Sequence, residues 1–383
     1  MSRIRLCVLA DALCDPHPRG LARYTRGLCT ALLESGEVDL ELVTQVDPAG
    51  VPMPPGRRSR LTAGREIVRE QLELPRLLAR HRADVLHAPA NRGLPAWSPC
   101  PTVGTRHDVI ERIFPPARAG HRRDRLRLLY ADAIAMRRAT VVATVSATSA
   151  RDIARLWPGC APRTLVAGQG VEARFFRPPP TAALEALRER HRLPRVFVLY
   201  VGGFEPRKEV AALVTAMAAC GVRDAGLVLA GAAGPWRPGI DAAVAAAGMV
   251  ERTRVLDFVD DADLPALYTA AACLACPSRY EGFGLPVVEA QAAGTPAVVS
   301  DGGALPEIAG DAALVAPVGE SAALATAIER ILTDTGLAAR LAEQGRRRAE
   351  DFRWERVAPR YLGLYRRLAG TGAVPPAPAP VYA

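Results

Sequence analysis

Short apolar and β-branched runs alternate along the chain with longer stretches that carry apolar residues at helical spacing. Such alternation predicts parallel strands that are covered by helices on both faces. The predicted strands are 4–10, 39–44, 84–87, 102–105, 140–146 and 164–167 in the first half, and 195–201, 226–230, 254–258, 273–276, 297–300 and 312–315 in the second. Helices are expected between them, for example over 20–34 and 122–138. The fold class is therefore α/β, with doubly wound parallel sheets.

A proline-rich segment, FRPPPT, divides the chain into two halves of this kind. We predict Rossmann-like domains over 1–175 and 184–353, joined by a linker over 176–183 and facing one another across a cleft. Ligands of such domains bind at the carboxyl ends of the strands. A helix over 354–370 is expected to pack back onto the body, and the Pro/Ala-rich tail over 371–383 to be frayed.

Length and composition agree with two packed domains, because 383 residues are many for a single hydrophobic core. A hydrophobic content of 49% with 23% charged residues is typical of a folded chain rather than a disordered one. No apolar run reaches the roughly 20 residues of a membrane helix. The N-terminal apolar run is interrupted by Asp11, which favours a buried strand over a signal peptide. We expect a cytoplasmic protein.

The net charge of +9 raises the question of nucleic acid or an anionic membrane as partner. Aromatic residues make up only 5% of the chain and no nucleic-acid signature is present, so nucleic acid is not expected. The basic segment 121–138 has apolar residues at helical spacing. It predicts either a packed helix with a solvated basic face, which we favour, or weak peripheral contact with a bilayer.

Eight cysteines are scattered along the chain, and only Cys273 and Cys276 lie close together. A lone CxxC inside an apolar run, with no second pair, is weak evidence for zinc. We predict buried, reduced thiols and no metal site.

One lysine, Lys208, stands among 49 basic residues, and it lies in the segment YVGGFEPRKEV. A predicted strand runs there into Gly202 and Gly203, and Arg207 and Lys208 follow at an expected helix start. Cations are electrostatically unfavourable at that end of a helix unless an anion shares the site. A solvated Arg-Lys pair is the alternative. The position of the only lysine favours a phosphate pocket made by a bidentate arginine and a lysine.

Two glutamates, Glu281 and Glu289, bracket a glycine-containing elbow in RYEGFGLPVVEAQAAG. A strand is expected before the elbow and a helix from Leu285, with Gly294 as its C-cap. The glycines allow a ligand to approach the backbone amides, and carboxylates accept hydrogen bonds from vicinal diols. Taken alone, Glu289 is equally well explained as a favourable charge near a helix N-terminus.

These two motifs resemble the donor site of glycosyltransferase family 4, whose members transfer sugars from nucleotide donors with retention of anomeric configuration. The resemblance covers most of the chain, although the N-terminal matches are looser. It includes TVSATSARDIAR, GQGVEARFFRP, DVLHAPANRGLP, GTRHDVIERIFPP, GLARYTRGL and LDFVDDADLPALYTAA. It implies the GT-B architecture, a nucleotide-sugar donor and no cofactor or metal.

The resemblance also implies roles for individual residues. Glu281 would lie near the hydroxyls of the transferred sugar, Arg207 and Lys208 would neutralise the diphosphate, and His107 would lie beside the reacting sugar. No enzyme nucleophile is implied, so Glu281 would position the sugar. The residues implied to bind the donor are Gly20, Gly203, Gly282, Phe283, Gly284, Leu285 and Glu289, the last through the ribose diol.

Three features depart from the family pattern or compete with it. Glu209 stands where many relatives have a small or amide residue, and the first loop, DPHPRGLAR, lacks a double glycine. The Asp-x-Asp within DDAD (260–263) binds a metal in another transferase architecture. Here it immediately precedes LPALYTAA, so we predict that it caps a helix.

The expected function is transfer of a hexose-type sugar from a UDP- or GDP-sugar to a hydroxyl of a small-molecule, glycan or lipid-linked acceptor. The alternatives are a nucleotide-binding oxidoreductase and a non-catalytic nucleotide-sugar-binding protein on the same fold. No G-x-G-x-x-G follows the first strand, which counts against the oxidoreductase. The donor base, the sugar and the acceptor stay open.

Overall fold

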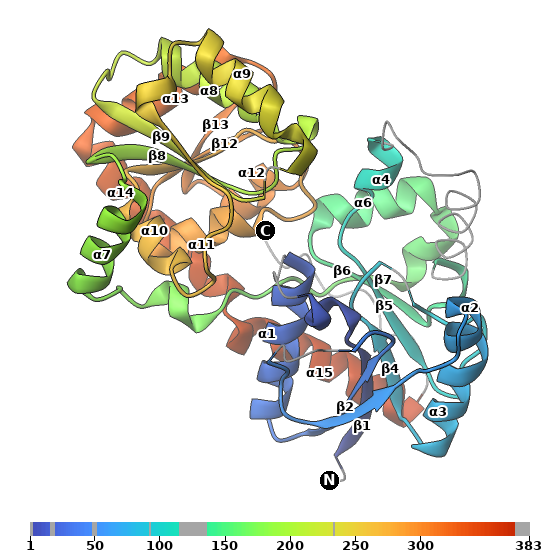
Figure 1. Cartoon of the computed structure of the whole chain (residues 1–383). Helices are drawn as coiled ribbons and strands as arrows, with labels where there is room; N and C mark the ends of the chain where they lie inside the picture. The colour runs from blue at the N-terminus through green and yellow to red at the C-terminus, as the bar shows by residue number, and fades with distance from the viewer. Residues whose placement is uncertain are drawn as a thin grey trace. The chain divides into compact units, whose positions relative to one another are not determined.

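The computed structural model describes residues 3–15, 20–47, 52–91, 93–114, 136–232 and 234–371. The chain divides into two compact bodies (Figure 1). The first body comprises Met1–Gly170 and Trp354–Ala383, and the second body comprises Val171–Arg353. Residues 176–183, the predicted linker, lie within the second body and lead into its first helix.

The first body is built on a parallel sheet with the strand order β3-β2-β1-β4-β5-β6-β7. The order reverses between β1 and β4, which is the topological switch point of a doubly wound sheet. Its strands are β1 (Ile4–Leu9), β2 (Val38–Thr44), β3 (Arg57–Arg60), β4 (Val85–Ala88), β5 (Thr102–Arg106), β6 (Val141–Thr144) and β7 (Thr164–Val166). Its helices are α1 (Gly20–Glu34), α2 (Glu66–Val68), α3 (Leu74–Arg80), α4 (Ile110–Ile113), α6 (Ala147–Leu156) and α15 (Trp354–Thr371).

The second body repeats the plan with the strand order β10-β9-β8-β11-β12-β13, so its switch point lies between β8 and β11. Its strands are β8 (Val196–Val201), β9 (Ala225–Ala230), β10 (Thr253–Leu256), β11 (Cys273–Cys276), β12 (Ala297–Ser300) and β13 (Ala313–Ala316). Its helices are α7 (Thr181–His191), α8 (Val210–Ala219), α9 (Arg237–Ala246), α10 (Leu264–Ala270), α11 (Leu285–Ala293), α12 (Leu305–Ala309), α13 (Ser321–Thr333) and α14 (Thr335–Ala349). Figure 1 shows α8, α9 and α13 on one face of this sheet and α10, α11 and α14 on the other.

The prediction of doubly wound parallel sheets is confirmed, and every predicted strand is present with ends within two residues. The sequence pattern missed β3, whose residues are RRSR. This strand lies at the edge of its sheet and three of its four residues are exposed, so no apolar run marks it. Most of the basic segment 121–138 lies outside the described residues, which resume at 136.

The last helix, α15, belongs to the first body, where it packs beside α1 and against β1 and β4 (Figure 1). Its apolar face is buried there, with residues such as Tyr361 and Leu364 fully enclosed. Within the part of the chain that the structure describes, no helix is both long enough and apolar enough to span a bilayer.

A buried chain of hydrogen bonds joins α15 to the sheet of the first body. The Tyr361 hydroxyl donates to the Gly168 carbonyl oxygen at 2.9 Å, and it accepts from the Tyr24 hydroxyl at 2.7 Å. Tyr24 lies on α1 and is fully buried. Because its proton is directed at Tyr361, Tyr24 accepts from the Thr105 hydroxyl on β5, at 3.1 Å.

The same chain fixes the protonation of His87, which is fully buried on β4. Thr105 donates to Tyr24, so it accepts from Nε2 of His87 at 2.7 Å, and this nitrogen carries the proton. Nδ1 of His87 then accepts from the Tyr365 hydroxyl at 2.7 Å. Burial lowers the pKa of His87 to about 3, and the nearby His107 adds to this shift. The imidazole is therefore neutral across the physiological range.

The neutral His87 predicts acid sensitivity of the first body. In the unfolded chain its pKa is near 6.5 and in the folded chain about 3, so below pH 6.5 the unfolded state binds the extra proton. The free energy of unfolding should therefore fall, with a slope that approaches about 1.4 kcal/mol per pH unit well below pH 6.5, by about 1.6 kcal/mol between pH 6.5 and pH 5. Urea unfolding of the unaltered protein and of His87→Gln at both pH values measures this. An equal loss in both proteins would show that His87 is not responsible.

Candidate functional site

The predicted phosphate loop and the predicted glutamate elbow meet at the switch point of the second sheet. β8 and β11 pair in parallel, with Val198 opposite Cys273, so their carboxyl ends lie at the same edge. β8 leads into Gly202 and Gly203 and then into a 3₁₀ turn over Pro206–Lys208. β11 leads into the loop that carries Glu281.

Glycine is required at the exit of β9 because the main chain there touches the main chain at the exit of β8. The amide of Gly202 donates to the Ala230 carbonyl at 2.9 Å. Gly231, at the end of β9, has φ +141°, and a Cβ atom on it would lie 2.0 Å from the Gly202 carbonyl oxygen. Gly203 is held by the Tyr200 hydroxyl, which donates to its carbonyl. The turn that presents the cations is thus fixed by close main-chain packing.

Glu281 lies against both cations of the phosphate loop. Its Oε1 accepts from Nζ of Lys208 and from the Ser278 hydroxyl, the latter at 2.7 Å. Its Oε2 lies 3.7 Å from Nη1 of Arg207. The three charged side chains are only 12–19% exposed. The structure therefore brings three of the four predicted catalytic residues together.

The main chain fixes this arrangement as well. The amide of Arg279 donates to the Arg207 carbonyl at 2.7 Å, and Nη1 of Arg207 donates to the Tyr280 carbonyl at 3.4 Å. Burial raises the pKa of Glu281, but the Lys208 ammonium and the Arg207 guanidinium outweigh it, so this pKa lies below its usual range. Glu281 is therefore ionised at neutral pH and cannot serve as a proton donor there.

Gly303 is a site residue that the sequence reasoning missed. It forms an isolated bridge with Glu281, and the amide of Ala304 donates to the Glu281 carbonyl at 2.8 Å. Gly303 has φ +62°, and a Cβ atom there would lie 2.4 Å from the Glu281 carbonyl oxygen. The double glycine at 302–303, two residues after the end of a predicted strand, was the signal that could have revealed this close approach.

The elbow between the glutamates has the predicted form. Gly282 and Phe283 are buried, and the Phe283 ring meets Phe352 edge to face at 5.5 Å. Gly284 has φ +99°, and a Cβ atom there would lie 2.7 Å from the Leu305 side chain. α11 begins at Leu285, as predicted, with its N-terminal amides directed at this loop. The predicted C-cap is also confirmed, because Gly294 follows α11 in the left-handed conformation.

Glu289 is only 1% exposed and lies on α11. Its Oε2 accepts from the Tyr268 hydroxyl on α10 at 2.8 Å. Tyr268 is buried, and its ring meets Phe175 edge to face at 5.9 Å. Sequence reasoning matched the segment that contains Tyr268 but did not single out the tyrosine. Its hydroxyl fixes the orientation of the Glu289 carboxylate.

The predicted helix cap in DDAD is wrong in its chemistry. Asp263 occupies the N-cap position of α10, but its side chain makes no capping hydrogen bond. Its φ of −86° and ψ of −17° are already helical, whereas a capping residue is extended. The carboxylate instead accepts from Arg190 at 2.6 Å, and Asp261 lies 3.4 Å from Arg174. Arginines rather than helix amides hold these aspartates.

Metal-binding clusters and reactive thiols are not found in the described residues. No group of three or more His, Cys, Asp or Glu side chains is arranged there to hold a metal ion. All eight cysteines are free, and all but the half-buried Cys14 and Cys100 are buried. Burial raises the pKa of Cys273 and of Cys276 to about 12, so both are protonated.

Two candidate residues lie on the first body. His107 follows β5, and its Nε2 donates to the Pro89 carbonyl at 2.8 Å while its ring meets Tyr24 edge on at 4.6 Å. Burial lowers the pKa of His107, although the bond to Pro89 opposes the shift. The ring is therefore neutral at pH 7. Gly20 is the first residue of α1, and the loop before it, 16–19, lies outside the described residues.

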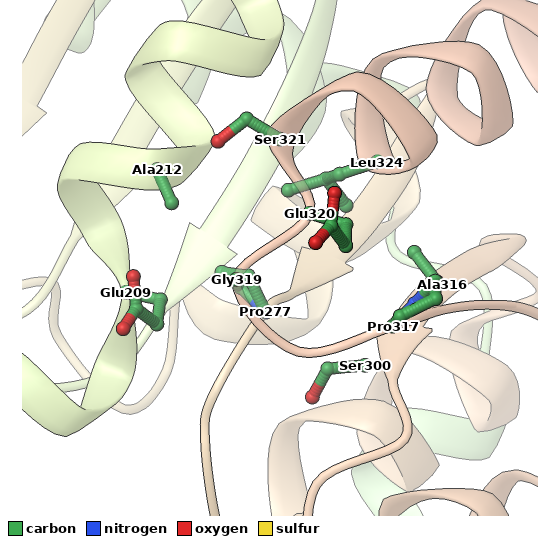
Figure 2. A pocket seen from close by; sticks show the side chains of 10 residues that line it. All are labelled: Glu209, Ala212, Pro277, Ser300, Ala316, Pro317, Gly319, Glu320, Ser321 and Leu324. Carbon is green, nitrogen blue, oxygen red and sulfur yellow. The ribbon is translucent and has the colours of Figure 1, made fainter.

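A shallow hollow opens beside the charged site in the second body (Figure 2). Glu209 and Ala212 of the α8 side face Glu320, Ser321 and the other lining residues across it. None of the predicted site residues lines this hollow. Its lining residue Glu209 directly follows Lys208 in the sequence, which places the hollow beside the charged site.

Comparison with known proteins places both bodies in one family of sequences. The sequence model described as "Glycosyltransferase Family 4" matches residues 18–175, and that described as "Glycosyl transferases group 1" matches residues 185–348. A D-inositol 3-phosphate glycosyltransferase of Salinispora arenicola (strain CNS-205) is 30% identical, over 87% of this chain and 84% of the relative. O-antigen chain mannosyltransferase B of Escherichia coli is 31% identical over 70% of each chain.

Solved structures share the architecture over nearly the whole chain. A sucrose-phosphate synthase from Thermosynechococcus elongatus has a TM-score of 0.77 at 27% identity, covering 96% of this chain and 99% of that one. Anabaena Alr3699/HepE, solved with UDP and glucose, has a TM-score of 0.74 at 19% identity, covering 94% of this chain and 99% of that one. The two-domain GT-B fold that the sequence predicted is thereby confirmed.

Because Gly303 is tightly packed, we predict that Gly303→Ala lowers the free energy of unfolding by much more than the strain of a left-handed backbone conformation would by itself. Gly248→Ala is the matched control, because Gly248 has φ +65° but nothing within 4 Å of its Cβ position. The control should cost about 1 kcal/mol, from backbone strain only. Gly303→Ala should cost at least about 3 kcal/mol, since the Glu281 carbonyl must move. Denaturant unfolding measures both, and equal losses would contradict the contact.

Proposed function

Since the chain belongs to glycosyltransferase family 4, we propose that it transfers a hexose-type sugar from a UDP- or GDP-sugar to an acceptor hydroxyl, with retention of anomeric configuration. Members of this family transfer sugars, so the reaction class is sugar transfer and the chain is not an oxidoreductase. The donor, the stereochemistry and the acceptor are the parts that we propose.

One observation carries the proposal. The only lysine of the chain and its neighbour Arg207 lie at the switch point of the second sheet, both against the carboxylate of Glu281. A diphosphate offers the same kind of anionic oxygens as Glu281, so the cations are already placed for phosphate oxygens. Vicinal sugar hydroxyls can then donate to Glu281, whose lowered pKa keeps it an acceptor.

In the proposed reaction, negative charge grows on the diphosphate as the bond from the anomeric carbon to its phosphate oxygen breaks. Arg207, Lys208 and the amides at the start of α11 stabilise that charge without rearrangement. The acceptor oxygen attacks from the same face, and the leaving phosphate oxygen takes its proton. Glu281 positions the sugar and forms no covalent bond. We propose that no metal is required, because side-chain cations supply the positive charge.

The remaining assignments follow the family resemblance. Glu289 would bind the ribose diol of the donor, because the Tyr268 hydroxyl orients its carboxylate and a carboxylate can accept several hydrogen bonds at once. Gly203, Gly282 and the backbone of 283–285 would approach the donor closely. Gly20 and His107, which belong to the first body, would lie near the reacting sugar and the acceptor. His107 is neutral, with its proton on Nε2.

The names of two relatives support a proposal for the acceptor. One relative is named for D-inositol 3-phosphate, a small cyclitol phosphate, and another for an O-antigen chain, a glycan. For the donor, a structural neighbour was solved with UDP and glucose. We propose a hydroxyl of a cyclitol or of a glycan end as acceptor.

A nucleotide panel tests the proposal. We expect UDP, GDP or both to raise the melting temperature, and the matching nucleotide sugar to be turned over in the presence of EDTA. Proton NMR of the product should show the anomeric configuration of the donor. Stabilisation by NAD⁺ but by no nucleoside diphosphate would overturn the donor assignment. An inverted product or strict dependence on Mn²⁺ would overturn the proposed mechanism.

Loss of one phosphate-loop cation should be costly. Arg207→Ala is expected to lower turnover by about 10²–10³-fold, because it removes one preorganised donor to the leaving group. Arg347→Ala is the matched control, since Arg347 is 71% exposed on α14 and, within the part of the chain that the structure describes, forms an ion pair with Glu343 at 3.5 Å. Steady-state kinetics of both variants measures the effect. A similar rate in both variants would contradict the role of Arg207.

A further inference from the structure

Glu209, which follows the two cations directly, has a backbone conformation that side chains rarely adopt. Its φ is +53° and its ψ is +34°, where glycine or asparagine is favoured. The residue ends the 3₁₀ turn over Pro206–Lys208 and begins α8. Its side chain makes no capping hydrogen bond to α8. A glutamate at this position therefore costs free energy that helix capping does not offset.

The Glu209 carboxylate is instead directed at the loop that carries Glu281. Its Oε1 accepts from Nε of Arg279, and the Glu209 side chain is 14% exposed whereas Arg279 is 53% exposed. The amide of Arg279 also donates to the Arg207 carbonyl. The two loops thus touch through residues 207–209 on one side and 279–281 on the other. The Glu209–Arg279 pair closes the outer end of this contact, and Lys208–Glu281 forms the inner end.

We infer that Glu209 and Arg279 are positioning residues, which hold the Arg207–Lys208 turn in register with Glu281 so that both cations reach the diphosphate. This inference rests on the proposed function. The strained conformation of Glu209 aims its carboxylate outward to Arg279, and this ion pair prevents the turn from sliding along the Glu281 loop. Neither residue touches the reacting atoms, and both act through Lys208 and Arg207.

The ion pair also has an electrostatic consequence. Glu209 adjoins Lys208 in the sequence, so its negative charge opposes the binding of a diphosphate. Arg279 neutralises that charge. Removing Arg279 leaves Glu209 uncompensated beside the phosphate site, whereas removing Glu209 leaves an additional cation there. The two single substitutions should therefore differ, and the double substitution should be milder than the loss of Arg279 alone.

Calorimetric titration with UDP and UMP, or with GDP and GMP, tests the inference on the full-length protein. The variants are Glu209→Asn, Arg279→Gln and the double variant. Asparagine tolerates the left-handed conformation, so Glu209→Asn removes the ion pair while relieving backbone strain. The matched control is Glu343→Gln with Arg347→Gln, which removes an exposed ion pair of α14.

For Glu209→Asn we expect an unchanged or higher melting temperature but about fivefold weaker UDP binding and slower turnover. For Arg279→Gln we expect at least about tenfold weaker UDP binding, with the double variant closer to Glu209→Asn. The affinity for UMP should stay within about twofold in each variant, because only the diphosphate needs both cations in register. The α14 control should match the unaltered protein.

Two results would overturn the inference. One is a Glu209→Asn variant with the UDP affinity and turnover of the unaltered protein. The other is an equal loss of UDP and UMP affinity, which indicates general damage to the site. If the unaltered protein binds neither UDP nor GDP, the proposed function itself fails and this inference fails with it. That outcome is seen before any variant is made, so the two failures are distinguishable.

Discussion

The main-chain hydrogen bond from the Arg279 amide to the Arg207 carbonyl is the contact on which the rest of the site depends. β8 and β11 become neighbours only because the strand order reverses between them, although β9 and β10 lie between them in the sequence. Parallel pairing then brings both exits to one edge, and this bond joins their main chains there. Lys208 and Glu281 lie opposite one another as a result.

The hydrophobic pattern predicted the strands because central parallel strands are buried on both faces. It could not reveal β3, whose arginines are solvated at a sheet edge. The two site motifs were visible because Lys208 is the only lysine and because two glutamates flank Gly-Phe-Gly. Their direct contact was not predictable from spacing, since about 70 residues separate them and only the strand order joins them.

The partners of the motif residues were harder to predict than the motifs. Tyr268 orients Glu289, yet a tyrosine at helical spacing is most simply explained as a core residue. Glycine is needed at position 303 because a side chain there would clash with the Glu281 carbonyl, and this clash is seen only once the two loops are placed side by side. The cap predicted at Asp263 failed because Arg190, far away in the sequence, competes for the same carboxylate. Each case depends on a long-range neighbour.

The two bodies hold their polar interiors together in different ways. In the first body a chain of neutral hydroxyls and a neutral imidazole ends on a carbonyl, and no member of this chain carries a charge. In the second body a carboxylate is kept ionised by two cations. Salt and competing anions screen the second arrangement but act little on the first. The charged cluster of the second body thus supplies the electrostatic field that an anionic ligand would meet.

The position of α15 has a consequence for how the chain is made. Synthesis runs from the N-terminus, so the second body, contiguous over Val171–Arg353, is complete before α15 is translated. The first body is begun earlier but finished last, because Tyr24 and His87 each take one of their hydroxyl partners, Tyr361 and Tyr365 respectively, from α15. The domain that starts first on the ribosome therefore closes its core after the domain that follows it.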